Sequence, residues 1–168
     1  MAQVYVSVGS NLDRERNIAT SLQVLTESYG ELQQSSVYES AAVGFDSAPF
    51  YNLVVGFSTQ ESPQVIQDQL HAIEDRCGRQ RTATLSARTL DLDLLLYDDL
   101  VLVDGKLLLP REDINRYAFV LGPLAEIAGT ARHPVTAVSY ADMWAAFDDS
   151  DQLLTRIDWP PVASPAGE

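Results

Sequence analysis

The stretch Arg88-Thr-Leu-Asp-Leu-Asp-Leu-Leu-Leu-Tyr97 alternates acidic and apolar residues before it becomes fully apolar. Side chains alternate between the two faces of a β-strand, so Asp91 and Asp93 point to one face and the leucines around them to the other. We therefore predict a strand over residues 89–97. One face of this strand packs in the core, and the other face carries two carboxylates.

Working outward toward the N-terminus, the pattern predicts strand, helix, strand, strand and helix before this strand. The second helix begins at Ser62-Pro63, an N-cap followed by proline at the first helical position, and ends near Cys77, with Gly78 as its stop. The other elements are strands over 3–8, 33–41 and 50–58 and a first helix that ends near Ser28.

After the acidic strand, residues 101–109 read as a hairpin around Asp104-Gly105. Short helices are predicted near 123–128 and 140–147. The order of the main elements is that of a ferredoxin-like (split βαβ) α+β fold, an antiparallel sheet with helices on one face. We expect one domain over residues 1–168, with a partly disordered tail over 148–168.

Composition excludes several classes of function. A net charge of −13 over 168 residues argues against general binding to nucleic acid or to anionic membranes. No apolar run is long enough to span a bilayer, and the N-terminus lacks the basic segment of a signal peptide. With a single cysteine no internal disulfide can form. We therefore expect a cytoplasmic protein.

The paired carboxylates indicate a metal site. Two acidic side chains on one strand face repel each other, and Mg²⁺ relieves that repulsion while leaving positions for water and phosphate oxygens. Six arginines fall between residues 76 and 116, and arginine clamps phosphates well. Together these groups are what phosphoryl transfer requires. The alternative is an acidic strand face beside a solvated basic one.

Other chemistries have weaker support. His71 and His133 are the only histidines, which argues against a histidine metal cluster or a Ser-His-Asp triad. Cys77 at a helix end fits core packing better than nucleophilic catalysis. The turn at Gly9-Ser10-Asn11 is too short for a phosphate-binding P-loop.

The motifs, taken together, resemble those of the 6-hydroxymethyl-7,8-dihydropterin pyrophosphokinase family of folate biosynthesis, from Val4 to Gly129. Arg-Thr-Leu-Asp-Leu-Asp is the most specific marker. The markers are Gly9-Ser-Asn-Leu12, Ser36-Val-Tyr-Glu-Ser40, Phe50-Tyr-Asn52, Ile73-Glu74, Gly78-Arg79, Arg88-Thr-Leu-Asp-Leu-Asp93, Phe119-Val-Leu121 and Pro123-Leu-Ala-Glu-Ile127.

The resemblance implies that Asp91 and Asp93 hold two Mg²⁺ ions with ATP, and that pyrophosphate passes to the pterin hydroxyl. Catalytic contacts to phosphate would come from Arg79, Arg81 and Arg88. Residues facing ATP would be His71, Glu74, Arg81, Arg88, Arg111 and Arg116. We expect small-molecule substrates only, and a monomer.

The resemblance also implies a pterin slot between the rings of Phe50 and Phe119, with Asn52 bonded to the edge of the ring and with Ser40 and Val43 completing the pocket. A flat heteroaromatic ring suits two phenyl faces. For either phenylalanine alone, ordinary core packing is the alternative, and Asn52 reads equally well as a turn residue.

The chain departs from the family pattern mainly in segments expected to face ATP. Leu85-Ser86-Ala87 stands where the family has Trp-Gly-Pro, Pro110-Arg111 where it has Pro-His, and Arg116 is one position further from Phe119 than usual. Three alternatives therefore stay open. They are a divergent paralogue that binds a pterin-like ring with little transfer, a transferase for a different alcohol, and a ferredoxin-like interaction domain.

Overall fold

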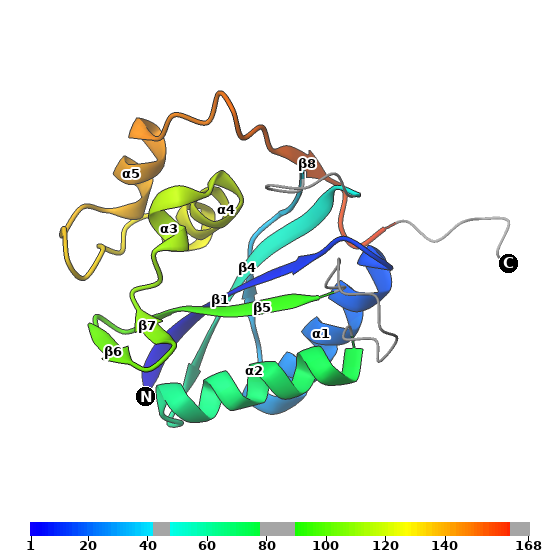
Figure 1. The fold of residues 1–168 in the computed structure, drawn as a ribbon, viewed down its shortest axis with the longest axis horizontal. Helices are drawn as coiled ribbons and strands as arrows, with labels where there is room; N and C mark the ends of the chain where they lie inside the picture. The colour runs from blue at the N-terminus through cyan, green and yellow to red at the C-terminus, as the bar shows by residue number, and fades with distance from the viewer. Residues whose placement is uncertain (42–47, 78–89, 162–168) are drawn as a thin grey trace, which may run out of the picture.

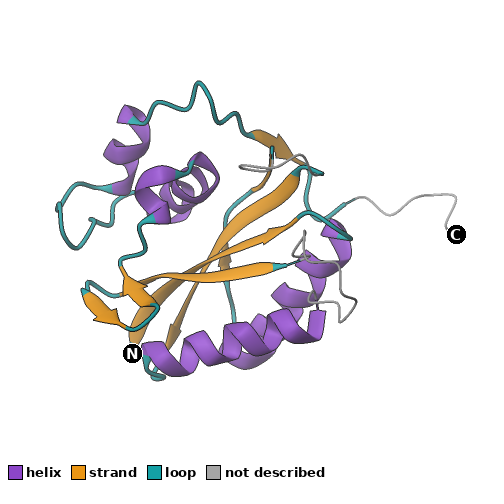
Figure 2. Ribbon diagram, viewed as in Figure 1, coloured by secondary structure: helices purple, strands orange, loops and turns teal. Residues whose placement is uncertain are grey.

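The computed structural model describes residues 1–41, 48–77 and 90–161. Its main sheet has the strand order β5-β1-β4-β3-β8, and every pairing along it is antiparallel. The three longest strands are β1 (Ala2–Ser10), β4 (Phe50–Thr59) and β5 (Asp91–Tyr97), of which β5 forms one edge of the sheet. Figures 1 and 2 show these strands crossing the middle of the molecule. The arrangement confirms the predicted ferredoxin-like α+β fold.

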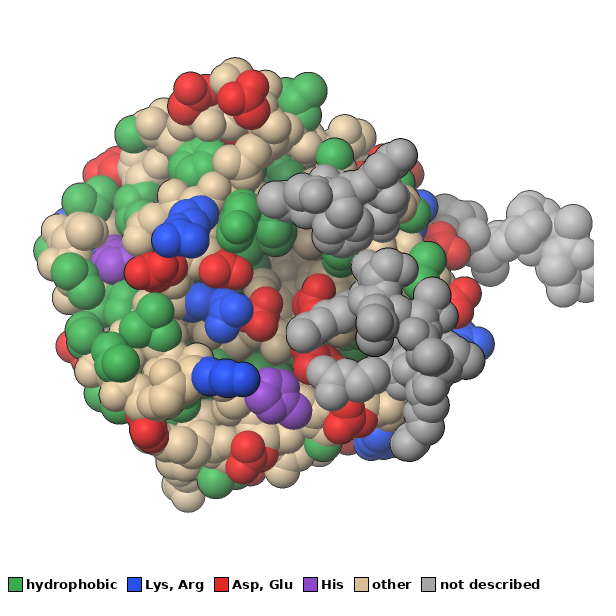
Figure 3. All heavy atoms as spheres, viewed as in Figure 1, with side chains coloured by type: hydrophobic (Ala, Val, Ile, Leu, Met, Phe, Trp, Pro, Cys, Tyr) green, Lys and Arg blue, Asp and Glu red, His purple; other side chains and the backbone are tan. Residues whose placement is uncertain are grey.

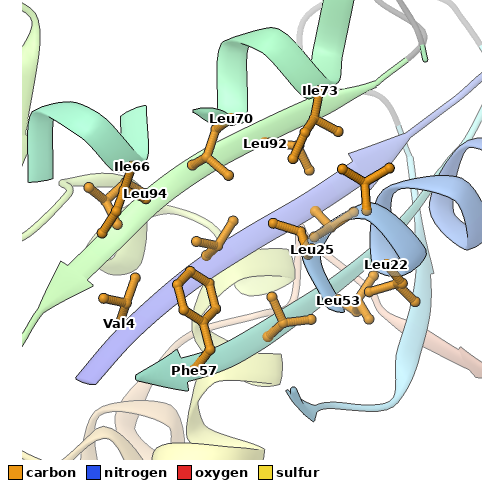
Figure 4. Packing of buried hydrophobic residues seen from close by; sticks show 14 of the residues in the cluster. Val4, Leu22, Leu25, Leu53, Phe57, Ile66, Leu70, Ile73, Leu92 and Leu94 are labelled. Atoms are coloured by element: carbon orange, nitrogen blue, oxygen red, sulfur yellow. The ribbon is translucent and has the colours of Figure 1, made fainter. Parts of the chain in front are cut away.

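Two long helices cover one face of the sheet, α1 (Arg14–Tyr29) and α2 (Pro63–Cys77). Apolar side chains from both helices meet alternate residues of the strands, as Figure 4 shows for Leu25, Ile73 and Leu92. Cys77 packs at the margin of this core, and burial raises the pKa of its thiol. Core packing therefore accounts for this cysteine.

The opposite face is covered as well, which corrects the expectation of helices on one face. Helices α3 (Asp113–Arg116), α4 (Ala118–Ala128) and α5 (Tyr140–Ala146) gather there (Figure 1). Their apolar residues form a second core with Val54, Leu95 and Leu96, whose side chains are buried on this face of the sheet. The predicted helix near 123–128 was too short. Proline commonly occupies the first turn of a helix, but Pro123 lies inside α4, which begins at Ala118.

A register shift between Tyr5 and Val6 explains three consecutive buried leucines in β5. Tyr5 pairs with Leu96 but Val6 pairs with Leu94, so Leu95 is an extra residue in the ladder. The shift places Leu94 in the first core and Leu95 with Leu96 in the second. One strand therefore serves both layers of helices.

The smaller strands either join the main sheet or form a separate two-stranded hairpin. The predicted strand over 33–41 is split into β2 (Gln33–Gln34) and β3 (Val37–Ser40). The predicted hairpin is confirmed as β6 (Leu102–Asp104) and β7 (Leu107–Leu109). Beyond residue 148, where no element was predicted, β8 (Thr155–Ile157) pairs with β3. No helix in the described part of the chain combines the length and apolar character needed to cross a membrane.

Candidate active site

A pocket of about 280 Å³ opens where β1 ends and β4 and β5 begin, beside the junction of α3 and α4. The face seen in Figure 3 is hollowed near its centre, with acidic side chains gathered beside the hollow. Volumes of this order suit a small organic ligand. The residues that line the pocket are Ser7, Val8, Gly9, Ser40, Ala41, Phe50, Asn52, Asp91, Asp93, Asp113, Tyr117 and Phe119.

Strand register brings the polar groups of the pocket together. Gly9 of β1 lies between its pairing partners Asn52 of β4 and Asp91 of β5, and Ser7 pairs with Asp93. Residues two apart on a strand share a face, so both aspartates line the pocket while the intervening leucine is buried in the first core. The predicted alternation is therefore confirmed.

An arginine partly neutralises the acidic wall. The Arg111 guanidinium lies 3.5 Å from Asp93 Oδ1 through Nη2 and 3.3 Å from Asp113 Oδ2 through Nε. All three side chains are about one-third exposed, so solvent screens these ion pairs. Asp113 is a third pocket carboxylate that the sequence patterns did not single out.

The acidic pair fits a metal that shares its coordination with a substrate. Among residues 1–41, 48–77 and 90–161, no three His, Cys, Asp or Glu side chains are grouped closely enough to hold an ion by themselves. Mg²⁺ commonly takes one or two carboxylates and completes its shell with water and phosphate oxygens. Asp91 and Asp93 supply that number of ligands at the open mouth of the pocket.

The carboxylate of Glu74 is hydrogen-bonded to the backbone of β5, the strand that carries Asp91 and Asp93. Glu74 lies on α2, is 5% exposed, and accepts a hydrogen bond of 2.7 Å at Oε2 from the backbone N–H of Leu92. Leu92 stands between the two aspartates, so this bond fixes the backbone that carries both carboxylates. That Glu74 also faces the nucleotide remains a prediction; in the structure its Oε2 is bonded to the backbone of the acidic strand.

Two aromatic residues stand on the other walls of the pocket, Phe50 from β4 and Phe119 from α4. Tyr117 stacks on Phe119 with ring centroids 5.0 Å apart. Between these walls, the Asn52 side-chain amide donates from Nδ2 to Ser40 Oγ at 2.7 Å, and both residues are buried. Asn52 is thus a fixed strand residue rather than a turn residue.

The predicted site residues fall into three groups. Ser40, Phe50, Asn52, Phe119, Asp91 and Asp93 line one pocket. Arg111 contacts that pocket, whereas His71 is exposed on α2, and Arg116 is exposed in an ion pair with Glu112. Val43, Arg79, Arg81 and Arg88 lie outside the described residues. The pocket residues not predicted are Ser7, Val8, Gly9, Ala41, Asp113 and Tyr117, of which only Gly9 belonged to a quoted motif.

The fold and the pocket together define a ferredoxin-like α+β protein with a pocket lined by paired carboxylates and by aromatic rings. A model of the family described as 7,8-dihydro-6-hydroxymethylpterin-pyrophosphokinase (HPPK) matches residues 5–129. The chain belongs to this family.

Individual relatives agree with the family match. The 2-amino-4-hydroxy-6-hydroxymethyldihydropteridine pyrophosphokinase of Haemophilus influenzae is 34% identical over 132 residues, covering 76% of this chain and 82% of that protein. Its Aquifex aeolicus counterpart is 34% identical over 137 residues, covering 80% and 86%. The folic acid synthesis protein fol1 of Pneumocystis carinii is 32% identical over 151 residues. That match covers 88% of this chain, but the chain spans only 20% of the fungal protein.

A solved structure shows the same fold. The crystal structure of wild-type Plasmodium falciparum HPPK-DHPS superposes with a TM-score of 0.68 at 13% identity. The superposition covers 86% of this chain and 44% of the other, so this chain spans less than half of that protein. At this level of identity the likeness concerns the fold alone.

Proposed function

We propose that this chain transfers the pyrophosphoryl group of ATP to 6-hydroxymethyl-7,8-dihydropterin in folate biosynthesis. The observation that supports this most directly is that one pocket joins the carboxylates of Asp91 and Asp93 to the rings of Phe50 and Phe119. A flat heteroaromatic alcohol suits the two rings, and phosphates bridged to hard cations suit the two carboxylates. The substrate's reacting oxygen then lies between its ring and the triphosphate.

In the proposed reaction the hydroxymethyl oxygen bonds to the β-phosphorus, and the bond from that phosphorus to the α,β-bridging oxygen breaks. AMP leaves, and the hydroxyl proton is released. Phe50, Phe119 and Asn52 hold and orient the ring, so their contribution is positioning. Two Mg²⁺ ions, which Asp91 and Asp93 would hold, supply charge neutralisation for the phosphate oxygens when bound.

The basic residues of the proposal divide by location. Arg111 lies beside the carboxylates and Arg116 at the end of α3, and in the proposed complex both bind anionic oxygens of ATP. The roles of Arg79, Arg81 and Arg88 in catalysis are proposed from the motifs, as are those of His71 and Glu74 beside the nucleotide. We further propose a monomeric enzyme in the cytosol, a reducing compartment that suits a single free cysteine.

A direct assay tests the function. Purified protein is incubated with Mg-ATP and the reduced hydroxymethylpterin, and AMP and pterin diphosphate are quantified together. We expect equimolar products that require both substrates and Mg²⁺, and none from an Asp91→Asn/Asp93→Asn double variant. AMP formation that does not depend on the pterin, or no AMP from a folded protein that binds Mg-ATP, would refute the proposal.

A further inference from the structure

The segment over residues 148–157 lies beyond residue 129, where the family match ends, yet it contacts the α3–α4 junction that borders the pocket. Figure 1 shows the chain passing from α5 to β8, the strand that pairs with β3. On the way, Gln152 reaches the junction of α3 and α4, more than thirty positions earlier in the sequence. This junction carries Tyr117 and leads directly into Phe119, both of which line the pocket.

Gln152 satisfies one backbone group on each side of Tyr117. Its Oε1 accepts a hydrogen bond from the backbone N–H of Ala118 at 2.9 Å, and its Nε2 donates one to the backbone carbonyl of Arg116 at 3.0 Å. Only one orientation of the side-chain amide makes both bonds, because one partner is a donor and the other is an acceptor. The backbone of the junction is therefore held at two points.

These two groups have no partner within their own helices. Ala118 supplies the first N–H of α4 and Arg116 the last carbonyl of α3, and such terminal groups need partners from outside the helix. The residue at the N-cap of α4, Tyr117, makes no side-chain capping bond. Gln152 thus caps both helices from a distant segment of the chain.

The chain that follows Gln152 is anchored at two points. Two residues later, Leu154 packs over Gly122 of α4 so closely that a methyl group on that glycine would lie 3.1 Å from Leu154 Cδ1. Further on, β8 pairs with β3, and Thr155 lies opposite Glu39, next to the pocket residue Ser40. The segment is therefore attached to α4 and to the strand edge that adjoins the site.

A second hollow makes the two bonds of Gln152 more important. It has a volume of about 480 Å³ and lies between residues 150–154 and the aromatic pair Tyr117 and Phe119. Because this space separates much of the segment from the rings, packing on that side is incomplete. Hydrogen bonds to the backbone then carry more of the positioning.

We infer that Gln152 is a positioning residue for the ring site, which sets the orientation of the Phe119 wall through the α3–α4 junction. This inference rests on the proposed function for the identity of the ring. It assigns to Gln152, which lies outside the family match, a role in supporting one wall of the pocket.

The test compares Gln152→Ala, Gln152→Glu and Asp149→Ala with the wild type. Asp149 is exposed in the same segment and lines neither hollow, so it serves as the matched control. Binding of 6-hydroxymethyl-7,8-dihydropterin is measured by calorimetry with saturating Mg²⁺ and α,β-methylene-ATP, whose α,β bridge cannot be cleaved. Exchange of the Ala118 amide is followed by NMR, and thermal unfolding is recorded for each protein.

For Gln152→Ala we expect roughly tenfold weaker ring binding, the scale of losing two backbone hydrogen bonds. The Ala118 amide should exchange faster, and the KM for ATP should not change. Gln152→Glu keeps the acceptor and loses the donor, so its ring affinity should be intermediate. Asp149→Ala should match the wild type in every measurement.

Unchanged ring affinity in Gln152→Ala would overturn the inference. So would equal losses of ring and nucleotide affinity with a lowered unfolding temperature, because those indicate general destabilisation. If the wild type binds the ring but forms no AMP, the proposed function fails and the positioning role stands. If the wild type does not bind the ring, both fail.

Discussion

The side-chain carboxylate of Glu74 accepts a hydrogen bond of 2.7 Å from the backbone N–H of Leu92, the residue between the two pocket aspartates. We predict that Glu74→Ala lowers the free energy of unfolding by roughly 1–3 kcal/mol, because a buried N–H loses its partner. Urea unfolding measures this loss. A wild-type midpoint for the alanine variant would contradict the structural role.

Glu74→Gln is the matched control, since its amide oxygen still accepts the bond from Leu92. We expect a smaller loss of stability for this variant. A raised KM for ATP with unchanged stability would instead favour direct contact between Glu74 and the nucleotide, as the family motifs imply. A structural role of Glu74 is therefore detected as a change in the free energy of unfolding, and a nucleotide-binding role as a change in the KM for ATP.

The two aspartates should matter for metal binding and turnover more than for folding. We predict that Asp91→Asn and Asp93→Asn each reduce turnover roughly 100-fold or more and weaken Mg²⁺ binding, since a metal contributes several kcal/mol to charge stabilisation. The unfolding free energy should change by less than about 1 kcal/mol, because relief of like-charge repulsion opposes loss of the partly exposed pair between Asp93 and Arg111.

Asp113→Asn is the control for that experiment, since Asp113 lines the same pocket and contacts the same arginine. We expect a smaller effect on Mg²⁺ binding than from either member of the pair, measured by calorimetry. Equal losses from all three variants would show that the acidic wall acts through its total charge.

The ring site should depend on both aromatic walls. We predict that Phe50→Ala and Phe119→Ala each weaken pterin binding by about 1–3 kcal/mol, the scale of losing a stacking face, with less effect on ATP. Phe147, which stacks on Trp144 away from the pocket, is the control. If calorimetry finds normal pterin binding in both variants, the ring binds elsewhere.

The main sheet could be predicted from the sequence because its strands alternate and its helices begin and end at recognisable residues. Pro63 and the Asp91–Asp93 spacing are local signals of this kind. The split between β2 and β3 is not local: Ser35 Oγ accepts from the Val54 backbone N–H, and Ser36 bonds to Glu126 of α4. Such distant partners leave no pattern in the strand itself.

The pocket residues that belong to local motifs could likewise be predicted, whereas those placed by distant parts of the chain could not. Motif residues such as Asn52 and Phe119 were identified. Asp113, the first residue of α3, and Tyr117, which follows its last residue, line the pocket because of where this short helix lies in the fold. Gln152 gives no signal at all in a Pro- and Asp-rich tail. Its partners are backbone groups, whose positions depend on the folded chain rather than on residue type.

A buried histidine should make stability depend on pH. His133 is 4% exposed, and its Nδ1 accepts from the backbone N–H groups of Val135 and Thr136, which requires a neutral ring. Burial lowers the pKa of His133 below its ordinary value of about 6.5. The unfolded chain therefore takes up this proton at a higher pH than the folded chain does.

Stability contributed by the neutral ring is thus fully present above about pH 6.5 and falls as the pH drops toward the folded-state pKa. We predict that His133→Asn weakens this pH dependence, measured by urea unfolding between about pH 8 and pH 5. His71→Gln is the control, since His71 is exposed. An unchanged slope in the His133 variant would contradict the prediction.

We expect pterin binding to require glycine at position 9, because the Asn52 side chain occupies the space that a side chain at this position would need. A methyl group at Gly9 would lie 2.9 Å from Asn52 Oδ1 and 3.7 Å from Phe50 Cδ2. Gly9 is not among the residues with positive φ, so this crowding, and not backbone strain, is the obstacle to a side chain. Gly9→Ala should therefore displace the amide that donates to Ser40.

We predict that Gly9→Ala weakens pterin binding by about 1–3 kcal/mol, since a displaced amide leaves buried polar groups unpaired, while the KM for ATP stays near its wild-type value. Gly56→Ala is the matched control: on the neighbouring strand, its methyl group would meet the Tyr5 ring at 2.8 Å, away from the pocket. The control should lose stability without a selective loss of pterin affinity. Normal pterin binding in folded Gly9→Ala would show that Asn52 can move without loss of pterin affinity, and that its amide does not hydrogen-bond to the edge of the ring.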